Sequence, residues 1–550
     1  MKFRISIVIS LCFVVAILGI SSRPCLAAGD RNLDTNVSYP SSAWVQNGGR
    51  VINIRNTGTS GITQAVGNGA ADDTNAFKSA YTYIANQFVN TSGSTSYILW
   101  IPNGTYLVTD SLIYTRPWVQ IVIPPNTLPL DINNLRLIGQ SRAGTVIQLA
   151  NACSGFLTSG SAKAVIRFQH PNTTFNNLQT SNLCENLTVN VGSGNPGAVA
   201  IQFQGANSAK MSNVQLTSND GGGLYGLWFP IGSLQAYLKD ITITGFDNAV
   251  CSAANPEVFS AFEHLTCTNQ HKAAISIPGG GVTLRDMVSN QSAYHAPAVQ
   301  FSPGQTGGSV VLLDSQLNGG SSTSPAVVIT GTQQDCFARN TSVSGYTVAV
   351  QQSGTTAVSG SFISEYSAYN PTTTLFAGQD THSYAMAPQD TPMLPLGDPS
   401  ENTANWVNVE TYRSGTNSDT VTMTKAFAAA ATGGNSVVYF PRLTYDIESS
   451  VYVPACVNRV DFMFSTFTGW GNFVVSATSA NPVTFVGKSG QVPILISGAR
   501  TVVADLLSGN LTNTQSAPVT SFIECCTNMG AGTQFCTANQ MVFARSINDE

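Results

Sequence analysis

The stretch ADDT at positions 71–74 opens a unit that decides the fold, because the same unit returns late in the chain. A run of helical character follows it, and then comes the apolar segment YILWIPNGTY at 97–106. The second copy begins with NSDT at 417–420 and, after another helical run, reads VVYFPRLTY at 437–445. In both copies a Thr-Tyr pair lies three and four residues after the proline, and Pro102 and Pro441 are 339 residues apart.

The two copies share an ordered set of features rather than a single motif. Each has an Asp-Thr, an amphipathic helix, an apolar strand and a proline turn, and similar strands precede them, VINI at 51–54 and WVNV at 406–409. Asp or Ser before an apolar run predicts a helix start, because its side-chain oxygen accepts a hydrogen bond from a free N–H of the first turn. Self-similarity at a fixed offset indicates repetition, so we expect two copies of one module.

Between the two units a short motif recurs: a polar residue, a residue that is usually apolar, any residue, and then an apolar one. It begins at Asn134, Asn186, Asn213, Asp240 and His264, with looser copies at Asp314 and Asn340. The steps from Asn186 to His264 are 27, 27 and 24 residues. Several short strands per turn of about 20–30 residues predict a parallel β-helix, whereas an antiparallel sandwich would show hairpin turns roughly every 8–12 residues. We interpret the recurring Asn as a corner residue that tolerates the left-handed conformation, the alternative being a ligand.

These patterns define an all-β chain with a domain boundary. We expect a first β-helical module over 28–382 and a second over 402–550, the second incomplete at its C-terminus. The segment 383–401 is rich in Pro and Met and predicts a linker.

The first 27 residues predict a secretory signal. Lys2 and Arg4 precede an apolar run, and Cys25-Leu26-Ala27 resembles a cleavage site. The alternative is a membrane anchor, but the apolar run is short for a span.

Cleavage would remove three basic residues and no acid, which takes the net charge from −5 to −8. A mildly acidic secreted protein is a poor partner for nucleic acid or anionic membranes.

Nine of the eleven cysteines would remain after cleavage, and cysteines outside the cell usually pair. The candidate disulfides are Cys153 with Cys184, Cys251 with Cys267, and Cys536 with Cys525 or Cys526. A metal site is disfavoured because the chain has no CxxC pair and its five His are scattered. We therefore expect neither a metal nor another cofactor.

The Asp-Asp-Thr, helix, strand-Pro-x-Gly-Thr-Tyr unit resembles the opening of pectate-lyase-type β-helix proteins. Two such units in tandem resemble glycoside hydrolase family 55, the exo-β-1,3-glucanases. The resemblance implies two tandem right-handed parallel β-helices, side by side, with a substrate cleft between them. A fold alone does not specify an activity.

Two motifs near the C-terminus carry the functional part of this resemblance. FIE at 522–524 and FARSINDE at 543–550 are similar to the family's F-x-E and W/Y-A-R-Q-x-N-x-E. The resemblance implies that Glu550 is the general acid and that Glu524 helps to hold the attacking water, as glycoside hydrolysis requires a proton donor and a group that activates water. Ser546 replaces the usual Gln, and Phe543 replaces the usual Trp or Tyr. The 26 residues between the two acids are about one coil, so we expect them on neighbouring rungs of one face.

In the first module the resemblance implies weaker candidates for binding sugar and water, Gln204 and Ser233, with Asn207 where a second Gln would stand. Four tryptophans could stack on sugar rings, although Trp is more often found in the core: Trp100, Trp228, Trp406 and Trp470.

The sequence thus predicts a secreted, monomeric, inverting exo-β-1,3-glucanase that acts on laminarin-like glucan. A different class is a non-catalytic carbohydrate-binding or adhesion β-helix, and a third is another polysaccharide-degrading β-helix enzyme. The chain has no Gly-His-Gly and no Arg-x-Lys, the motifs of a polygalacturonase.

Overall fold

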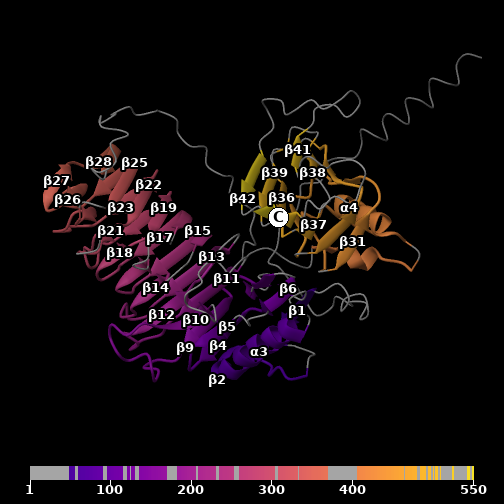
Figure 1. The fold of residues 1–550 in the computed structure, drawn as a ribbon, viewed down its shortest axis with the longest axis horizontal. Coiled ribbons are helices and arrows are strands. Elements are labelled where there is room, and N and C mark those ends of the chain that lie inside the picture. The colour runs from indigo at the N-terminus through magenta and orange to yellow at the C-terminus, as the bar shows by residue number, and fades with distance from the viewer. Residues whose placement is uncertain are drawn as a thin grey trace, which may run out of the picture.

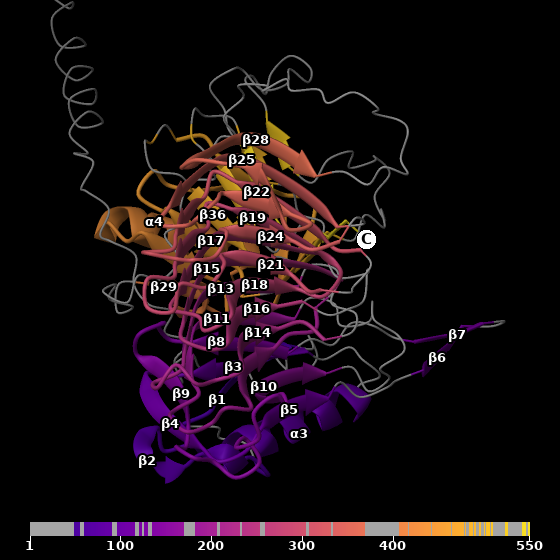
Figure 2. The same ribbon diagram turned by 90° about the vertical axis from the view of Figure 1, so that its left-hand side faces the viewer.

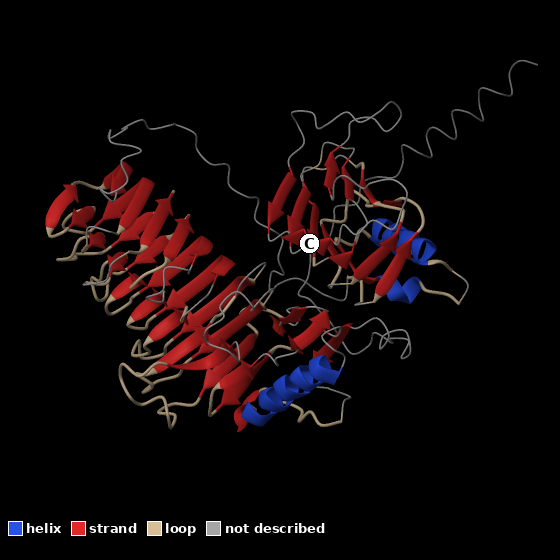
Figure 3. Ribbon diagram, viewed as in Figure 1, coloured by secondary structure: helices blue, strands red, loops and turns tan. Residues whose placement is uncertain are grey.

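A computed structural model describes residues 49–368 and 406–509, with short internal gaps, and three further strands at 523–525, 542–545 and 548–549. The expected signal, the linker 383–401 and Glu550 lie outside the described residues. Apart from two α-helices and a 3-10 helix, η3 (Val409–Tyr412), the described elements are strands (Figures 1 and 3). In this part of the chain every helix is too short or too polar to span a bilayer.

The two α-helices begin in the same way. In α3 (Thr74–Asn90) the hydroxyl of Thr74 accepts a hydrogen bond from the backbone N–H of Thr109 at 2.8 Å. In α4 (Asp419–Gly433) the hydroxyl of Thr420 accepts one from the N–H of Glu448, also at 2.8 Å. Each Thr therefore ties its helix start to the end of the strand that follows the proline turn.

The proline turns are also built alike. The phenol of Tyr106 donates to the carbonyl of Pro102 at 2.7 Å, and that of Tyr445 donates to the carbonyl of Pro441 at 2.8 Å. Both tyrosines are fully buried. The repeated unit of the sequence therefore repeats in three dimensions, down to single hydrogen bonds.

The strands of the first module form two long sheets that are parallel except at the last strands (Figures 1 and 2). Sheet 1 consists of β1 (Gly49–Asn53), β2 (Asn68–Asp72), β3 (Ser96–Ile101), β4 (Gly104–Val108), β8 (Leu135–Gly139), β9 (Thr145–Leu149), β11 (Leu183–Asn190), β13 (Lys210–Thr217), β15 (Leu234–Thr244), β17 (Phe259–Thr268), β19 (Gly281–Arg285), β20 (Val288–Asn290), β22 (Ser309–Leu313), β23 (Gln316–Asn318), β25 (Asp335–Ser344) and β28 (Phe362–Ala368). Sheet 2 consists of β5 (Leu112–Thr115), β10 (Lys163–Gln169), β12 (Ala198–Gln202), β14 (Tyr225–Trp228), β16 (Asn248–Cys251), β18 (Ala273–Ile277), β21 (Val299–Phe301), β24 (Val327–Ile329), β26 (Val350–Gln352) and β27 (Thr355–Val358). A separate hairpin joins β6 (Gln120–Ile123) to β7 (Asn126–Pro129). The predicted parallel β-helix is confirmed.

Each coil bends sheet 1 sharply at one residue with positive φ. These residues are Asn186, Asn213, Asp240, His264, Asp286, Asp314 and Asn340, with φ between 50° and 57°. Six of them begin the recurring motif, so the corner interpretation is confirmed for those six copies, while Asn134 lies outside the described residues. Asp286 was missed because Ser289 occupies the last apolar position of its copy. Asn and Asp tolerate this conformation because their short polar side chains bond locally.

The corner side chains also bond to one another from coil to coil. Asn213 Nδ2 donates to Asn186 Oδ1 at 2.9 Å, and Asn340 Nδ2 donates to Asp314 Oδ1 at 2.7 Å. His264 lies between two carboxylates, with Nδ1 3.1 Å from Asp240 and Nε2 3.2 Å from Asp286. Polar contacts thus link the corner side chains of neighbouring coils in three groups: Asn186 with Asn213, Asp240 with His264 and Asp286, and Asp314 with Asn340.

The second module has shorter coils and three faces. Sheet 3 consists of β29 (Val407–Asn408), β30 (Val437–Tyr439), β33 (Arg459–Asp461), β36 (Val483–Val486), β39 (Val502–Asp505) and β42 (Val542–Arg545). Sheet 4 consists of β31 (Thr444–Ile447), β34 (Thr466–Gly469) and β37 (Ser489–Gly490), and it is continued by the pair β40 (Ser508–Gly509) and β43 (Asn548–Asp549). Sheet 5 consists of β32 (Val451–Tyr452), β35 (Phe473–Val475), β38 (Ile494–Ile496) and β41 (Ile523–Cys525). The core of the second module is separate from that of the first module and contains Phe440, Phe462, Phe467, Phe473 and Phe485.

The predicted disulfides that fall on described residues are wrong. Cys153, Cys184, Cys251 and Cys267 are all free and buried. Cys251 lies on sheet 2 and Cys267 on sheet 1, while the thiol of Cys153 donates to the carbonyl of Thr109 at 3.0 Å. Burial raises the pKa of the Cys251 thiol to about 11, so these cysteines act as small core residues. Cys526 and Cys536, and the side chain of Cys525, lie outside the described residues.

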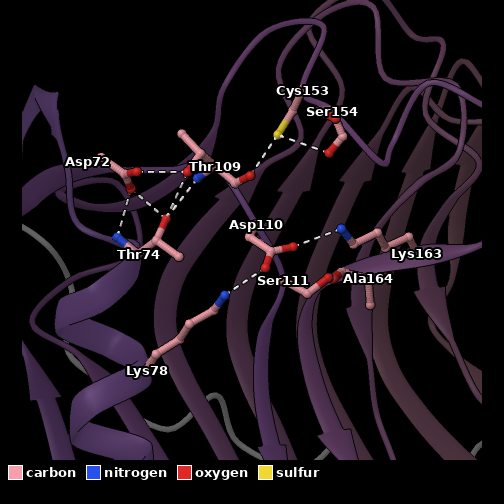
Figure 4. A network of polar contacts seen from close by, with 10 residues as sticks. All are labelled: Asp72, Thr74, Lys78, Thr109, Asp110, Ser111, Cys153, Ser154, Lys163 and Ala164. Atoms are coloured by element: carbon pink, nitrogen blue, oxygen red, sulfur yellow. Dashed lines mark hydrogen bonds and ion pairs between the residues drawn. The ribbon is translucent and has the colours of Figure 1, made fainter.

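Figure 4 shows the polar contacts that fix α3 to the first coils. Asp110 accepts hydrogen bonds from Lys163 at 2.8 Å and from Lys78 of the helix at 2.6 Å. Burial raises the pKa of Asp110, but the two lysines outweigh burial and hold the pKa well below its usual value. A carboxyl whose pKa is lowered on folding stabilises the folded state above its unfolded pKa.

We therefore predict that this contribution is complete above about pH 4 and is lost as the pH falls further towards the folded pKa of Asp110. In thermal unfolding scanned from pH 6 to pH 2, Asp110→Asn should have a lower Tm than wild type at pH 6. The difference should shrink as the pH falls. An equal difference at both ends of the range would contradict this assignment.

Candidate functional site

A column of outward-pointing side chains runs along sheet 1 just before the polar corners. Parallel register joins Trp100, Ile138, Glu185, Ser212, Lys239, Glu263 and Arg285 in that order. Their neighbours Cys184, Met211 and Leu238 point inward and belong to the core, as the alternation of a strand requires. The column changes from apolar to charged at Glu185.

The apolar end of this column is the contact between the two modules. Trp100, Ile138 and Leu183 form one buried cluster with Tyr439 and Met463 of the second module. Figures 1 and 2 show the second module on the side of sheet 1, with sheet 2 turned away from it. The charged side chains therefore begin where the two modules touch.

Burial decreases along the charged part of the column. The side chain of Glu185 is 1% exposed and that of Lys239 is 0% exposed, whereas Glu263 is 15% exposed and Arg285 is 17% exposed. The inner members are thus closed off from solvent, and the outer members are partly exposed.

The innermost charged member, Glu185, forms a buried ion pair with Lys210, a residue outside the column. The amino group of Lys210 lies 3.6 Å from Glu185, and the hydroxyl of Ser212 donates to the same carboxylate at 2.9 Å. Removing two charges from water is costly unless they are paired and hydrogen-bonded. Such a pair is suited to fixing the geometry of the contact between the two modules rather than to transferring a proton.

The outer members surround one carboxylate. Glu263 accepts a hydrogen bond from the phenol of Tyr237 at 2.5 Å and lies 3.6 Å from Lys239. Arg285 lies 3.5 Å from Glu263 and 4.0 Å from Asp314. The carboxylate of Glu263 is thus held between two cations and a phenol. Its chemistry is that of a hydrogen-bonding surface, which could bind hydroxyl groups.

The second module places a polar pair beside the same apolar contact. Arg459 and Asp461 lie on β33, both almost fully buried, with Nη2 of the arginine 2.9 Å from the carboxylate. Asp461 also accepts the backbone N–H of Met463 at 3.1 Å. Met463 belongs to the cluster between the modules, so this pair holds the contact from the opposite side.

The backbone of Glu524 is described, and that of Glu550 is not. Glu524 lies on β41 of sheet 5, in register with Leu495. Glu550 follows β43, which continues sheet 4. The coil here is longer than expected, since Val502 pairs with Val542, 40 residues on. Glu524 lies on a strand of sheet 5 and Glu550 lies outside the described residues, so the expectation that a 26-residue spacing stacks the two acids on one face stays a prediction.

Of the first-module candidates, only Gln204 is described. It follows β12 and is buried, and its backbone carbonyl accepts a hydrogen bond from Asn182 at 2.7 Å. Ser233 and Asn207 lie outside the described residues. Gln204 thus belongs to the first module and Glu524 to the second, on strands that share no sheet.

The four tryptophans differ in their surroundings. Trp100 is buried in the cluster between the modules, against which Trp406 packs. Trp228 is partly buried beside Tyr225, with ring centroids 6.2 Å apart. Trp470 is 68% exposed. Only Trp470 among them has the exposure that stacking on a sugar requires.

Among the described residues, no group of three or more His, Cys, Asp and Glu side chains is arranged to hold a metal ion. The charged column was not anticipated from the sequence. Its signal was a polar or charged residue immediately before a corner in successive coils, from Glu185 to Arg285.

Comparison with known proteins supports the fold of the first module. Residues 54–296 match the family model described as rhamnogalacturonase A/epimerase, pectate lyase-like. A glucan endo-1,3-beta-glucosidase of Trichoderma harzianum, BGN13.1, is 34% identical over 85 residues, which is 15% of this chain and 11% of that protein. The family model thus matches part of the first module, and the match to the glucosidase spans a small part of that protein's length.

Two solved structures show weaker likeness. The mannuronan C-5 epimerase AlgE6 A-module of Azotobacter vinelandii has 11% identity and a TM-score of 0.32, with 91% of this chain and 99% of that chain covered. The catalytic unit of a GH87 alpha-1,3-glucanase from Streptomyces thermodiastaticus has 10% identity and a TM-score of 0.21, with 96% and 70% covered. Likeness at this level does not distinguish one β-helix protein from another.

The buried ion pair gives a test of the contact between the modules. Lys210→Met leaves the Glu185 carboxylate buried without its cation, so the free energy of unfolding should fall by about 3–5 kcal/mol. Adding Glu185→Leu should restore most of the loss, since the two changes together leave an apolar pair. Urea unfolding followed by circular dichroism measures both effects.

Lys272→Met is the matched control. Lys272 also lies against a carboxylate, Asp247 at 2.7 Å, but its side chain is exposed, so its loss should cost at most about 1 kcal/mol. A Lys210→Met protein as stable as this control would show that the buried pair does not hold the contact.

Proposed function

We propose that this protein is a secreted glycoside hydrolase that cleaves a laminarin-like β-1,3-glucan from the chain end with inversion. The similarity to a relative named glucan endo-1,3-beta-glucosidase supports the substrate class. The observation that carries the proposal is the packing of two β-helical modules through an apolar cluster bordered by accessible hydrogen-bonding groups. A polysaccharide presents hydroxyl groups and little charge, which suits a surface of this kind.

In this proposal two acidic residues of the second module carry out the chemistry. Glu550 donates a proton to the leaving glycosidic oxygen, and Glu524 helps to position the water that attacks from the opposite face of the sugar. Gln204 and Ser233 of the first module contribute hydrogen bonds to the sugar and the water. No metal or other cofactor takes part, and the protein acts as a monomer.

The relative's name describes endo-action, whereas the tandem modules and the C-terminal motif support exo-action. The products distinguish the two. Exo-action releases glucose from the earliest times, and endo-action first releases a series of longer oligosaccharides. Inversion requires that the new reducing end appears first as the α-anomer.

The test is incubation of the protein with laminarin, followed by NMR of the anomeric protons and by chromatography of the products. We expect α-glucose as the first product. Glu550→Gln should lower kcat by about 10²–10⁴-fold, because a general acid contributes about that much, and Glu524→Gln should lower it as well.

Glu365→Gln on β28 of the first module is the control and should retain the wild-type rate. If the protein binds laminarin without releasing sugar, and Glu550→Gln leaves this binding unchanged, the protein is a non-catalytic carbohydrate-binding β-helix instead.

A further inference from the structure

Arg167 is a partly buried cation without a partner on the outer face of sheet 2. It lies on β10 between Ile166 and Phe168, which both belong to the core, so its own side chain points outward. Its Nε is buried and, among the described residues, its guanidinium has neither a hydrogen bond nor an ion pair. Buried polar groups in proteins nearly always have a partner, so this arginine requires an explanation.

Burial makes the charge of Arg167 costly. It lowers the pKa of the guanidinium, and within the described part of the chain no carboxylate raises that pKa again. Other buried cations have a counter-charge in the fold, since Lys210 lies against Glu185 and Arg459 lies against Asp461. Arg167 loses water without gaining a counter-charge, and a cation in such surroundings attracts an anion more strongly than one in bulk water does.

Gln202 lies beside Arg167 and is also without a partner. Parallel register pairs the two residues, and Ile201 belongs to the core, so the side chain of Gln202 points outward as well. It is 3% exposed, and its amide makes no hydrogen bond within the residues that the structure describes. Neighbouring strands are about 4.8 Å apart, so one small group can contact both side chains.

The surroundings of the two side chains select the charge of that group. The register column that contains them has no acidic residue: Ile113, Arg167, Gln202, Trp228 and Cys251. A guanidinium has only donors, arranged as a fork that matches a planar carboxylate or a phosphate, and an amide supplies two more. A metal ion or an ammonium group would be repelled, whereas an oxyanion would supply the missing charge and the missing acceptors.

We propose that Arg167 and Gln202 bind an oxyanion, a carboxylate or a phosphate, that is carried by a ligand of this protein. Arg167 supplies the charge and paired hydrogen bonds, and Gln202 donates a further one from its amide. The site is independent of the proposed hydrolysis, because it contains neither of the proposed acids and its occupation requires no turnover.

The test is calorimetric titration at low salt with three probes: D-glucuronate, glucose 6-phosphate and glucose. We expect one or both of the charged sugars to bind more tightly than glucose, and the comparison of the two distinguishes a carboxylate site from a phosphate site. Arg167→Gln should weaken this binding by about tenfold or more, because hydrogen bonds to a charged group are lost. Gln202→Met should weaken it by about threefold to tenfold.

Lys272→Met is the control. It removes a cation that has its own carboxylate, Asp247 at 2.7 Å, so binding should not change. Equal binding of all three sugars, no binding of any, or the same loss in Lys272→Met as in Arg167→Gln would overturn the proposal.

Thermal unfolding separates binding from a structural role of the arginine. Arg167→Met keeps the aliphatic stem and removes a charge that has no partner, so its Tm without ligand should equal or exceed that of the wild type. The charged sugar that binds should raise the Tm of the wild type and leave that of Arg167→Met unchanged. A lower Tm of Arg167→Met without ligand would show that the arginine serves the fold, and the proposal would then be wrong.

Discussion

The structure depends on a corner that must be turned within a single residue. In seven coils of the first module the backbone adopts positive φ at one position between two faces of sheet 1. The corner residue of each coil lies directly above the corner residue of the coil before it. The parallel register therefore runs without a slip from Glu185 to Arg285. A slip of one residue would exchange the inner and outer side chains. The core, the contact between the modules and the charged column all follow from this one conformation.

The same constraint explains how charged residues can be buried on the outer face of a sheet. Outward positions normally face water, but in the first coils they face the second module. Glu185 and Lys210 are a buried pair, whereas Glu263 and Arg285, three and four coils beyond Glu185, are partly exposed. Burial thus decreases along one column with distance from the apolar cluster between the modules.

The sequence was sufficient for features that repeat at short range. The corner residues Asn186 and Asn213 and the duplicated Thr-Tyr turns could be predicted because each depends on local conformation. The charged column could not, because its spacing varies from 27 to 22 residues and Ser212 interrupts its charges. The spacing of 26 residues also did not give the length of the coil that contains Glu524, which is 40 residues from Val502 to Val542. Pairs of cysteines close in sequence proved to lie on different sheets or within the core, where no partner thiol is reached.

The two ends of the first module have a consequence for how the protein behaves in solution. A stack of parallel coils ends in unpaired backbone groups, which would template the addition of further chains. At the last coil β28 pairs antiparallel with β25, and β27 pairs antiparallel with β26, while α3 packs on strands of the first coils. The reversed strands interrupt the parallel repeat on both sheets. The fold thus ends its own growth, and a molecule built on the same hydrogen-bonding plan as a fibril is kept from polymerising.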